Sequence, residues 1–341
     1  MNRREFTAAS IAAAVGNAPF VSNAQEKVFQ IGLLANSIPL ADLGPPMRTV
    51  NPAPRIIEDG LRQLGWVDGR NVRLIWKTAA GRYERWPDLI DEFLRMRVDV
   101  LVVFADEPAQ IALKKTRTTP IVLAGMGTLL NPKVIDSMQR PGVNVTGMSI
   151  DGLDLGPKRL EMLKAAIPPL SRVAVLVHAM RVPVPTYRQD FINPETQLAA
   201  SKLGVSMFAL EFEDIADIPR AFSEIVSKAA NGLIVGETPH MYYREWQLPI
   251  HELCIRHRLP AMWRILNSVD SGALMAYAPD ILEFYRSAPR YIDKILRGGK
   301  AADIPIETPS KFEFLINLKT ARAIGITIPS FVLSVADRVI E

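Results

Sequence analysis

Short apolar runs alternate with longer amphipathic segments along the chain from residue 28 onward. The runs are rich in β-branched residues and predict strands at 29–35, 72–77, 100–104, 121–124, 145–150, 173–177, 206–210, 232–235, 261–263, 274–276 and 312–317. Between most of them, residues recur at helical spacing, for example at 111, 112 and 115 and at 160, 163, 166 and 167. Strands buried on both faces and joined through helices are parallel, so the predicted class is α/β with doubly wound, right-handed parallel sheets.

Eleven strands would make one sheet unusually wide, which favours two lobes. Segments able to carry the chain across lie at 140–147, 268–272 and 304–310, where turn residues and prolines interrupt the pattern. Three crossovers predict that each lobe is assembled from separate pieces. Lobe one is predicted to be residues 28–144 plus 273–302, and lobe two residues 146–271 plus 311–341.

The first 24 residues are predicted to be an export signal. Arg3 and Arg4 precede the small and apolar stretch 6–15, and Ser22 to Ala24 form a small-x-small cleavage site. Arg3-Arg4-Glu5-Phe6 resembles the core of a twin-arginine signal. Asn2 and Thr7 depart from that pattern, so Sec export stays open. With no cysteine near the cleavage site to carry a lipid, the predicted location is the periplasm.

Composition excludes several classes of protein. Apolar residues make up 48% and charged residues 22%, which fits neither disorder nor a coiled coil. The net charge of +4 is spread without a basic block, which argues against nucleic-acid binding, and no apolar run approaches the roughly 18 residues of a membrane span, so no membrane insertion is expected. One cysteine and four scattered histidines give no metal-ligand pattern, so no metal or cofactor is predicted.

Several phrases of the sequence carry a family resemblance. They are GLRQLGWVDGRNV at 60–72, GRY and WPDL at 81–83 and 86–89, RPGVNVTG at 140–147, and PSKFEFLINLKTA at 309–321. With the RREF signal and the final ADRVIE, the chain resembles the ABC-transporter substrate-binding proteins of the tryptophan/tyrosine-type family. The resemblance covers essentially the whole chain. It implies the type I periplasmic-binding-protein fold, a small-molecule ligand, and an inner-membrane ABC permease as partner.

In such an architecture ligands bind at the carboxyl ends of the strands, which identifies candidates in lobe one. Asn36 and Ser37 follow the first strand and are suited to hydrogen bonding. Asp106 and Glu107 follow the third and could hold a ligand ammonium, although they also fit a simpler role as helix caps. Met126, between two glycines after the fourth strand, offers a pliable apolar contact.

Lobe two supplies the remaining candidates. His178 follows the strand at 173–177, and Glu237 and Thr238 follow the strand at 232–235. Tyr277 follows the returning strand and could stack on a flat ligand. Each has an alternative interpretation: His178 as a solvated loop residue, Glu237 as a helix cap and Tyr277 as core. The aromatic cluster Tyr242, Tyr243 and Trp246 fits the packed face of a helix better than a cage.

Two segments depart from the family pattern, both at the predicted cleft mouth. The loop 38–52 is long and rich in proline, and residues 178–187 replace the Asn-Pro-rich turn that family members commonly carry. The ligand can therefore differ from an aromatic amino acid.

The leading interpretation is a periplasmic solute-binding protein that captures a small organic ligand, amino-acid-like or aromatic, by hinge closure and delivers it to an ABC importer. An exported enzyme using the same cleft is one alternative. The first strand-to-helix turn at 32–37 lacks the dinucleotide fingerprint, and no phosphate loop or nucleophile elbow is present, so no catalytic residue is assigned. A sensory ligand-binding subunit is the other alternative.

Overall fold

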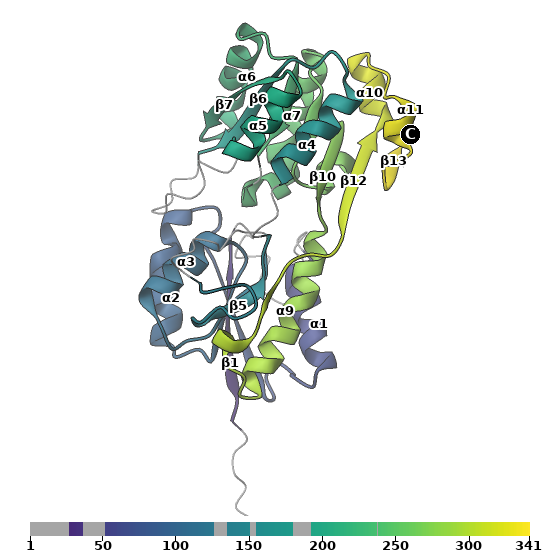
Figure 1. The fold of residues 1–341 in the computed structure, drawn as a ribbon. Coiled ribbons are helices and arrows are strands. Elements are labelled where there is room, and N and C mark those ends of the chain that lie inside the picture. Colours follow the sequence, from purple (N-terminus) through teal and green to yellow (C-terminus); the bar gives the residue numbers. More distant parts are fainter. Residues whose placement is uncertain (1–26, 37–51, 126–134, 151–154, 180–191, 237) are drawn as a thin grey trace, which may run out of the picture.

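The chain folds into two lobes, each a sheet covered by helices on both faces (Figure 1). The computed structural model describes residues 27–36, 52–125, 135–150, 155–179, 192–236 and 238–341. All eleven predicted strands are present, and each end lies within three residues of its predicted position. Continuous apolar runs were an adequate signal because these strands are buried on both faces.

The first sheet has the strand order β11-β5-β4-β3-β1-β2, with all neighbours parallel. Its strands are β1 (Phe29–Ala35), β2 (Val72–Thr78), β3 (Val100–Val103), β4 (Ile121–Leu123), β5 (Val145–Met148) and β11 (Ile306–Glu307). Helices α2 (Trp86–Arg95) and α3 (Asp106–Lys115) cover one face, and α1 (Ala53–Gln63) and α9 (Ile281–Leu296) the other, with short 3-10 turns η2 (Tyr83–Arg85) and η6 (Ala301–Asp303).

The second sheet has the order β13-β12-β10-β9-β8-β6-β7. Its strands are β6 (Arg172–His178), β7 (Ser206–Phe212), β8 (Gly232–Val235), β9 (Ala261–Trp263), β10 (Met275–Pro279), β12 (Phe312–Asn317) and β13 (Arg338–Ile340). One face carries α4 (Leu155–Ala166), α5 (Pro194–Lys202), α10 (Leu318–Ile324) and α11 (Ser330–Leu333), and the other α6 (Ile218–Ser227), α7 (Arg244–Arg256) and α8 (Asn267–Asp270), with 3-10 turns η4 (Ile215–Asp217) and η5 (Pro239–Tyr242).

One strand pair departs from the predicted parallel arrangement. β12 runs antiparallel to β10, with Pro279 opposite Phe312. The chain leaves the second sheet at Pro279 and returns to the same end at Phe312, which forces the reversal. The short strands β11 and β13 were not predicted, because two or three residues carry too little periodicity to be recognised.

The chain passes between the sheets three times: after β5, between β10 and α9, and between β11 and β12. The piece 273–302, predicted as one part of lobe one, is divided between the two sheets. Its strand β10 belongs to the second sheet and its helix α9 packs on the first. A short apolar strand such as 274–276 is compatible with either sheet, so its sequence does not show to which sheet it belongs. The residue boundaries of the lobes as moving units stay a prediction.

Close helix packing fixes the first lobe beside these crossings. Gly60 of α1 faces Pro289 of α9, and a Cβ added to Gly60 would lie 2.6 Å from the Pro289 Cγ atom. The Trp66 indole donates to the Asp293 carboxylate at 2.8 Å. The phrase at 60–72 therefore has a structural role, because it joins α1 to the helix that follows the second crossing.

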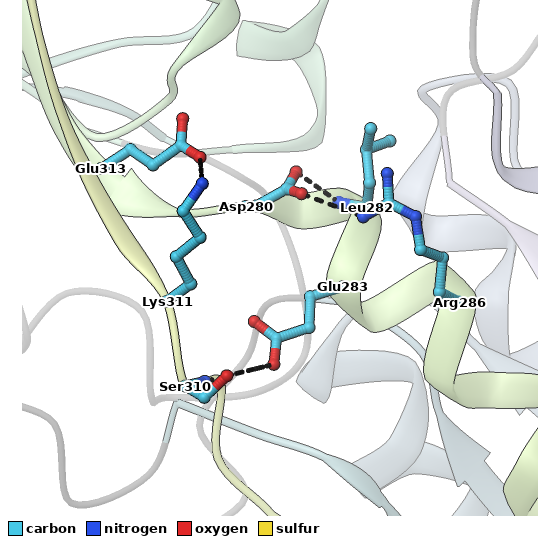
Figure 2. A network of polar contacts seen from close by, with 7 residues as sticks. All are labelled: Asp280, Leu282, Glu283, Arg286, Ser310, Lys311 and Glu313. Atoms are coloured by element: carbon cyan, nitrogen blue, oxygen red, sulfur yellow. Dashed lines mark hydrogen bonds and ion pairs between the residues drawn. The ribbon is translucent and has the colours of Figure 1, made fainter. Parts of the chain in front are cut away.

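Polar contacts surround the two connectors, which are residues 279–281 between β10 and α9 and residues 307–312 between β11 and β12 (Figure 2). Asp280 caps α9 by accepting from the Leu282 backbone at 2.9 Å, and it also pairs with Arg286. Glu283 accepts from Ser310 on the other connector, and Lys311 pairs with Glu313 of β12. The bonds between Glu283 and Ser310 therefore link the segments that carry the second and third crossings. The second crossing was predicted at 268–272, but those residues belong to α8 and the turn after it within the second lobe.

Candidate functional site

Asn36 lies at the carboxyl end of β1 and is 8% exposed. Its backbone carbonyl accepts a hydrogen bond from the Gly81 N–H at 3.0 Å, which ties it to the segment that follows β2. The side-chain Oδ1 atom has no hydrogen-bond partner among the described residues. A buried acceptor without a partner is costly, so Asn36 is suited to receive a donor from a ligand.

Asp106 and Glu107 are the first two residues of α3 and are 5% and 1% exposed. β3 is the neighbour of β1, with Val103 opposite Leu34, so both carboxylates lie at the same sheet edge as Asn36. The residue that precedes the helix is Ala105, so neither acid is the N-cap itself. The helix dipole favours negative charge in this first turn, and neither residue is without an interaction partner.

His178 is the last residue of β6 and is 6% exposed, so it is not a solvated loop residue. Burial lowers its pKa, and the ring is therefore neutral at pH 7. Its Nε2 atom lies 3.0 Å from the Glu213 carbonyl, which can only accept, so Nε2 carries the proton. Nδ1 is then a lone-pair acceptor, and it has no partner among the described residues.

Thr238 precedes the turn η5 and is 1% exposed, and its hydroxyl also has no partner within the described part of the chain. Two residues later, His240 stacks on Trp246 of α7 at 4.5 Å between ring centroids and meets the His178 ring edge-on at 5.0 Å. Burial and the neighbouring His178 lower the His240 pKa to about 4. The structure thus brings a buried hydroxyl and two neutral imidazoles together at one edge of the second sheet.

Tyr83 joins this group from the first lobe. It lies on η2, the turn that follows β2 in the chain. Its hydroxyl is 3.0 Å from the His240 Nδ1 atom, and the centroids of the two rings are 4.9 Å apart. Gly81 packs beside it with a φ of +77°, and a Cβ there would lie 2.6 Å from the His240 Nε2 atom. The carboxyl ends of the two sheets therefore face each other and touch at this point.

The remaining predicted residues divide into two sets. The Tyr277 ring is tilted against the Phe312 ring, with 6.0 Å between the ring centroids, and its backbone carbonyl accepts from Arg159 at 2.8 Å. Its contacts therefore lie within the second lobe, beside the connectors. Ser37, Met126 and Glu237 lie outside the described residues. For all nine candidates, contact with a ligand stays a prediction.

Four residues at the meeting point were missed as site candidates: Gly81, Tyr83, His240 and Trp246. A signal for the first two was present, because GRY belongs to the family phrases. His240 and Trp246 follow Thr238 closely in sequence, but their role depends on a contact with the other lobe. Trp246 was expected on a packed helix face; its stacking partner is the imidazole of His240.

A cavity of about 630 Å³ lies beside the connectors. The second lobe contributes Tyr242 at the end of η5, together with Tyr243 and Leu266, which directly precede α7 and α8. The first lobe contributes Leu282 and Tyr285 of α9. This volume falls in the range of small-molecule sites, roughly 300–1,000 Å³. None of the six predicted site residues that the structure describes lines it.

Two further observations concern the described residues alone. No helix among them combines the length and the apolar character needed to cross a membrane. No group of three or more His, Cys, Asp or Glu side chains in the same residues is placed to hold a metal ion, and Cys254 is buried with its pKa raised by desolvation.

Comparison with known proteins gives a family and a curated relative. A family model described as ABC transporter substrate binding protein matches residues 53–340. The tyrosine-binding protein of Clostridioides difficile (strain R20291) is 22% identical over 275 residues, which is 77% of this chain and 74% of that protein.

Solved structures share the fold. A conserved domain protein from Vibrio cholerae has a TM-score of 0.75 at 22% identity, and an ABC domain in complex with L-Trp from Streptococcus pneumoniae has a TM-score of 0.75 at 23% identity. Each comparison covers 92% of this chain and 100% of the other. The predicted class is confirmed: two α/β sheets of mostly parallel strands in a two-lobed, type I periplasmic-binding-protein-like fold.

Proposed function

The chain belongs to the ABC transporter substrate-binding protein family, and we propose that it is a periplasmic protein that captures a small amino-acid-like or aromatic ligand between its lobes and delivers it to an ABC importer. The family consists of binding proteins and not of enzymes. The first 24 residues, outside the described part of the chain, would direct export through a twin-arginine-like or Sec signal.

The observation that carries the proposal is a set of two buried acceptors and one buried hydroxyl at the carboxyl ends of strands in the two sheets. Asn36 Oδ1 comes from the first lobe, and His178 Nδ1 and the Thr238 hydroxyl from the second. Such groups are normally hydrogen-bonded, and a ligand held between the lobes would supply the missing donors and acceptors. Asp106 and Glu107 at the same edge would favour a ligand with an ammonium group.

The ligand class is supported by the relatives and by the aromatic surroundings. One relative is named as a tyrosine-binding protein, and one related structure contains L-Trp. In this chain Tyr83, His240 and Trp246 pack together where the two sheets meet, which makes the surroundings of the site aromatic and suited to a flat ligand. The cavity beside the connectors has room for a molecule of that size.

A thermal-shift screen of the mature chain against amino acids, aromatic acids and small amides tests the proposal. A ligand at a hundred times its Kd is expected to add about 2.7 kcal/mol to the free energy of unfolding. Thr238→Val should weaken binding of a compound found in the screen, whereas Thr118→Val, at an exposed position, should leave its binding unchanged. If no compound raises the midpoint, or if a product accumulates from one of them, the proposal fails.

The position of the ligand is tested separately. Leu282→Trp would fill the cavity beside the connectors without touching His178 or Thr238. Unchanged affinity of this variant, with weaker binding by Thr238→Val, would place the ligand at the buried acceptors. The reverse result would place it in the cavity.

A further inference from the structure

Tyr83 and His240 each belong to a different lobe and are held firmly by that lobe. Tyr83 is 4% exposed and stacks on the buried Trp86 at 4.7 Å between ring centroids. The His240 ring is fixed between Trp246 and His178. Two rigid surfaces therefore meet, and little side-chain entropy is lost when they touch.

The contact itself is a partly buried hydrogen bond with close ring packing. The Tyr83 hydroxyl can donate to the His240 Nδ1 atom at 3.0 Å, because the buried imidazole is neutral. Gly81 lies against the other edge of the same ring, where a side chain would not fit. The segment 81–83 thus forms a shaped seat for His240.

The contact between Tyr83 and His240, unlike the connectors, is present only in some arrangements of the two lobes. The connectors at 279–281 and 307–312 join the lobes covalently in every arrangement, whereas Tyr83 and His240 touch only when the sheet ends are close together. Any free energy that the contact supplies therefore favours the closed form over the open form.

We infer that Tyr83, His240 and Gly81 form a closure latch that sets ligand affinity by stabilising the closed form, as positioning residues that need not touch the ligand. The inference rests on the proposed function, since it concerns capture between the lobes. If only the closed form holds the ligand tightly, the apparent Kd equals the intrinsic Kd divided by the closed fraction. The latch then changes Kd in inverse proportion to that fraction.

The inter-lobe distance of the mature chain measures the closed fraction directly. Spin labels at Lys114→Cys on α3 and Ser223→Cys on α6 occupy exposed positions of the two lobes, and Cys254 is buried. Distance distributions are recorded without ligand and with L-tyrosine or L-tryptophan as the probe. Kd is measured on the same proteins by calorimetry.

Three changes break the latch in different ways. Tyr83→Phe keeps the ring and removes the hydroxyl, and His240→Phe keeps the stacking and removes the acceptor. Each should lower the closed-to-open ratio roughly fivefold, and the double variant should lower it little further, because one bond is lost in all three. Gly81→Ala should open the lobes more, since its Cβ would collide with His240.

Gly69→Ala is the matched control for Gly81→Ala. Gly69 has a φ of +78°, almost the same as the +77° of Gly81, but no atom lies within 4 Å of an added Cβ. Both variants therefore carry the same backbone strain, and only Gly81→Ala is expected to shift the distance distribution.

The latch is supported if the closed fraction falls and Kd rises in the same proportion in the Tyr83, His240 and Gly81 variants. It is overturned if Kd rises with an unchanged closed fraction, which would make these residues ligand contacts, or if neither quantity changes. If wild-type protein binds neither probe, the proposed ligand class fails, but the distances of the free protein still decide whether the latch exists.

Discussion

Glu283 at the start of α9 accepts two hydrogen bonds from Ser310 on the other connector. The backbone N–H of Ser310 lies 3.2 Å and its hydroxyl 3.0 Å from the same Glu283 Oε1 atom (Figure 2). The first residues of a helix packed on one sheet thus hold the strand that returns to the other. Movement of the lobes would bend both connectors together.

Removing the Glu283 acceptor should loosen this link. Glu283→Ala is expected to lower the free energy of unfolding by about 1–2 kcal/mol, because both charge-assisted bonds are lost. Ser310→Ala removes only the hydroxyl and should cost less, about 1 kcal/mol. Urea denaturation measures both, and amide exchange of residues 306–312 should quicken more in Glu283→Ala.

Lys311→Ala serves as the comparison, because it deletes a surface ion pair between Lys311 of the same connector and Glu313 of β12. Ion pairs at the surface contribute little to stability, so Lys311→Ala should change the free energy of unfolding by no more than about 0.5 kcal/mol. Equal losses in all three variants would show that the connector is sensitive to any change and that Glu283 has no special role.

Sequence patterns predicted the strands well and the contacts between lobes poorly. A run such as 232–235 is apolar throughout because the strand is buried on both faces, and this signal is local. The Glu283–Ser310 bond spans 27 positions and the Tyr83–His240 bond spans 157. Neither bond leaves a periodic pattern in the sequence, so only the folded structure reveals them.

The candidate site shows the same division. The positions of Asn36, Asp106 and Thr238 just after strands, and of His178 at the end of one, could be predicted because the carboxyl ends of parallel strands share one edge. Their contact with a ligand stays a prediction. His240 could not be predicted, since its importance depends on Tyr83 from a different sheet. The sheet to which β10 belongs could not be predicted from the local sequence either, because a short apolar strand fits either sheet.

Glu107 should matter for a ligand that carries an ammonium group. Its carboxylate is buried at the sheet edge, and Glu107→Gln preserves the shape while removing the charge. Loss of a hydrogen bond to a charged group is worth about 1.5–3 kcal/mol, so affinity should fall at least tenfold for an amine-bearing ligand and little for a plain carboxylic acid. Calorimetry with a matched amine and deaminated pair measures this difference.

Glu84→Gln is the control, since this carboxylate is exposed on η2. It should leave both affinities unchanged. If Glu107→Gln binds the amine as tightly as wild type and unfolds at the same temperature, Glu107 is not part of the site.

Gly60→Ala tests the packing of α1 against α9. Alanine is the better helix former by about 1 kcal/mol, but its methyl group would lie 2.6 Å from the Pro289 ring. Overpacking of this kind typically costs about 1–3 kcal/mol, so we expect net destabilisation in urea denaturation.

A second substitution separates the effect of the contact with Pro289 from the effect of the higher helix propensity of alanine. In the Pro289→Ala background the obstructing ring is gone, so Gly60→Ala should become neutral or stabilising. Additive effects of the two changes would contradict a direct contact between these residues.

Acidification should destabilise the fold through buried histidines. Burial lowers the pKa of His240 and of His251 to about 4, from about 6.5 in the unfolded chain, and the neighbouring Asp214 and the Ser271 carbonyl offset this only in part. As pH falls from 6.5 to 4, the unfolded chain takes up protons that the folded chain does not. The free energy of unfolding therefore decreases through this window and this contribution levels off below about pH 4.

At pH 5 each of these two histidines is expected to cost about 2 kcal/mol relative to pH 7. Urea denaturation at pH 7, 6 and 5 measures the slope, and His240→Phe should reduce it because one depressed group is removed. Thr118→Val, an exposed change that removes no titratable group, should leave the slope unchanged. A wild-type slope in His240→Phe would mean that His240 is solvated in the free protein, which would place the chain in an arrangement where Tyr83 and His240 are apart.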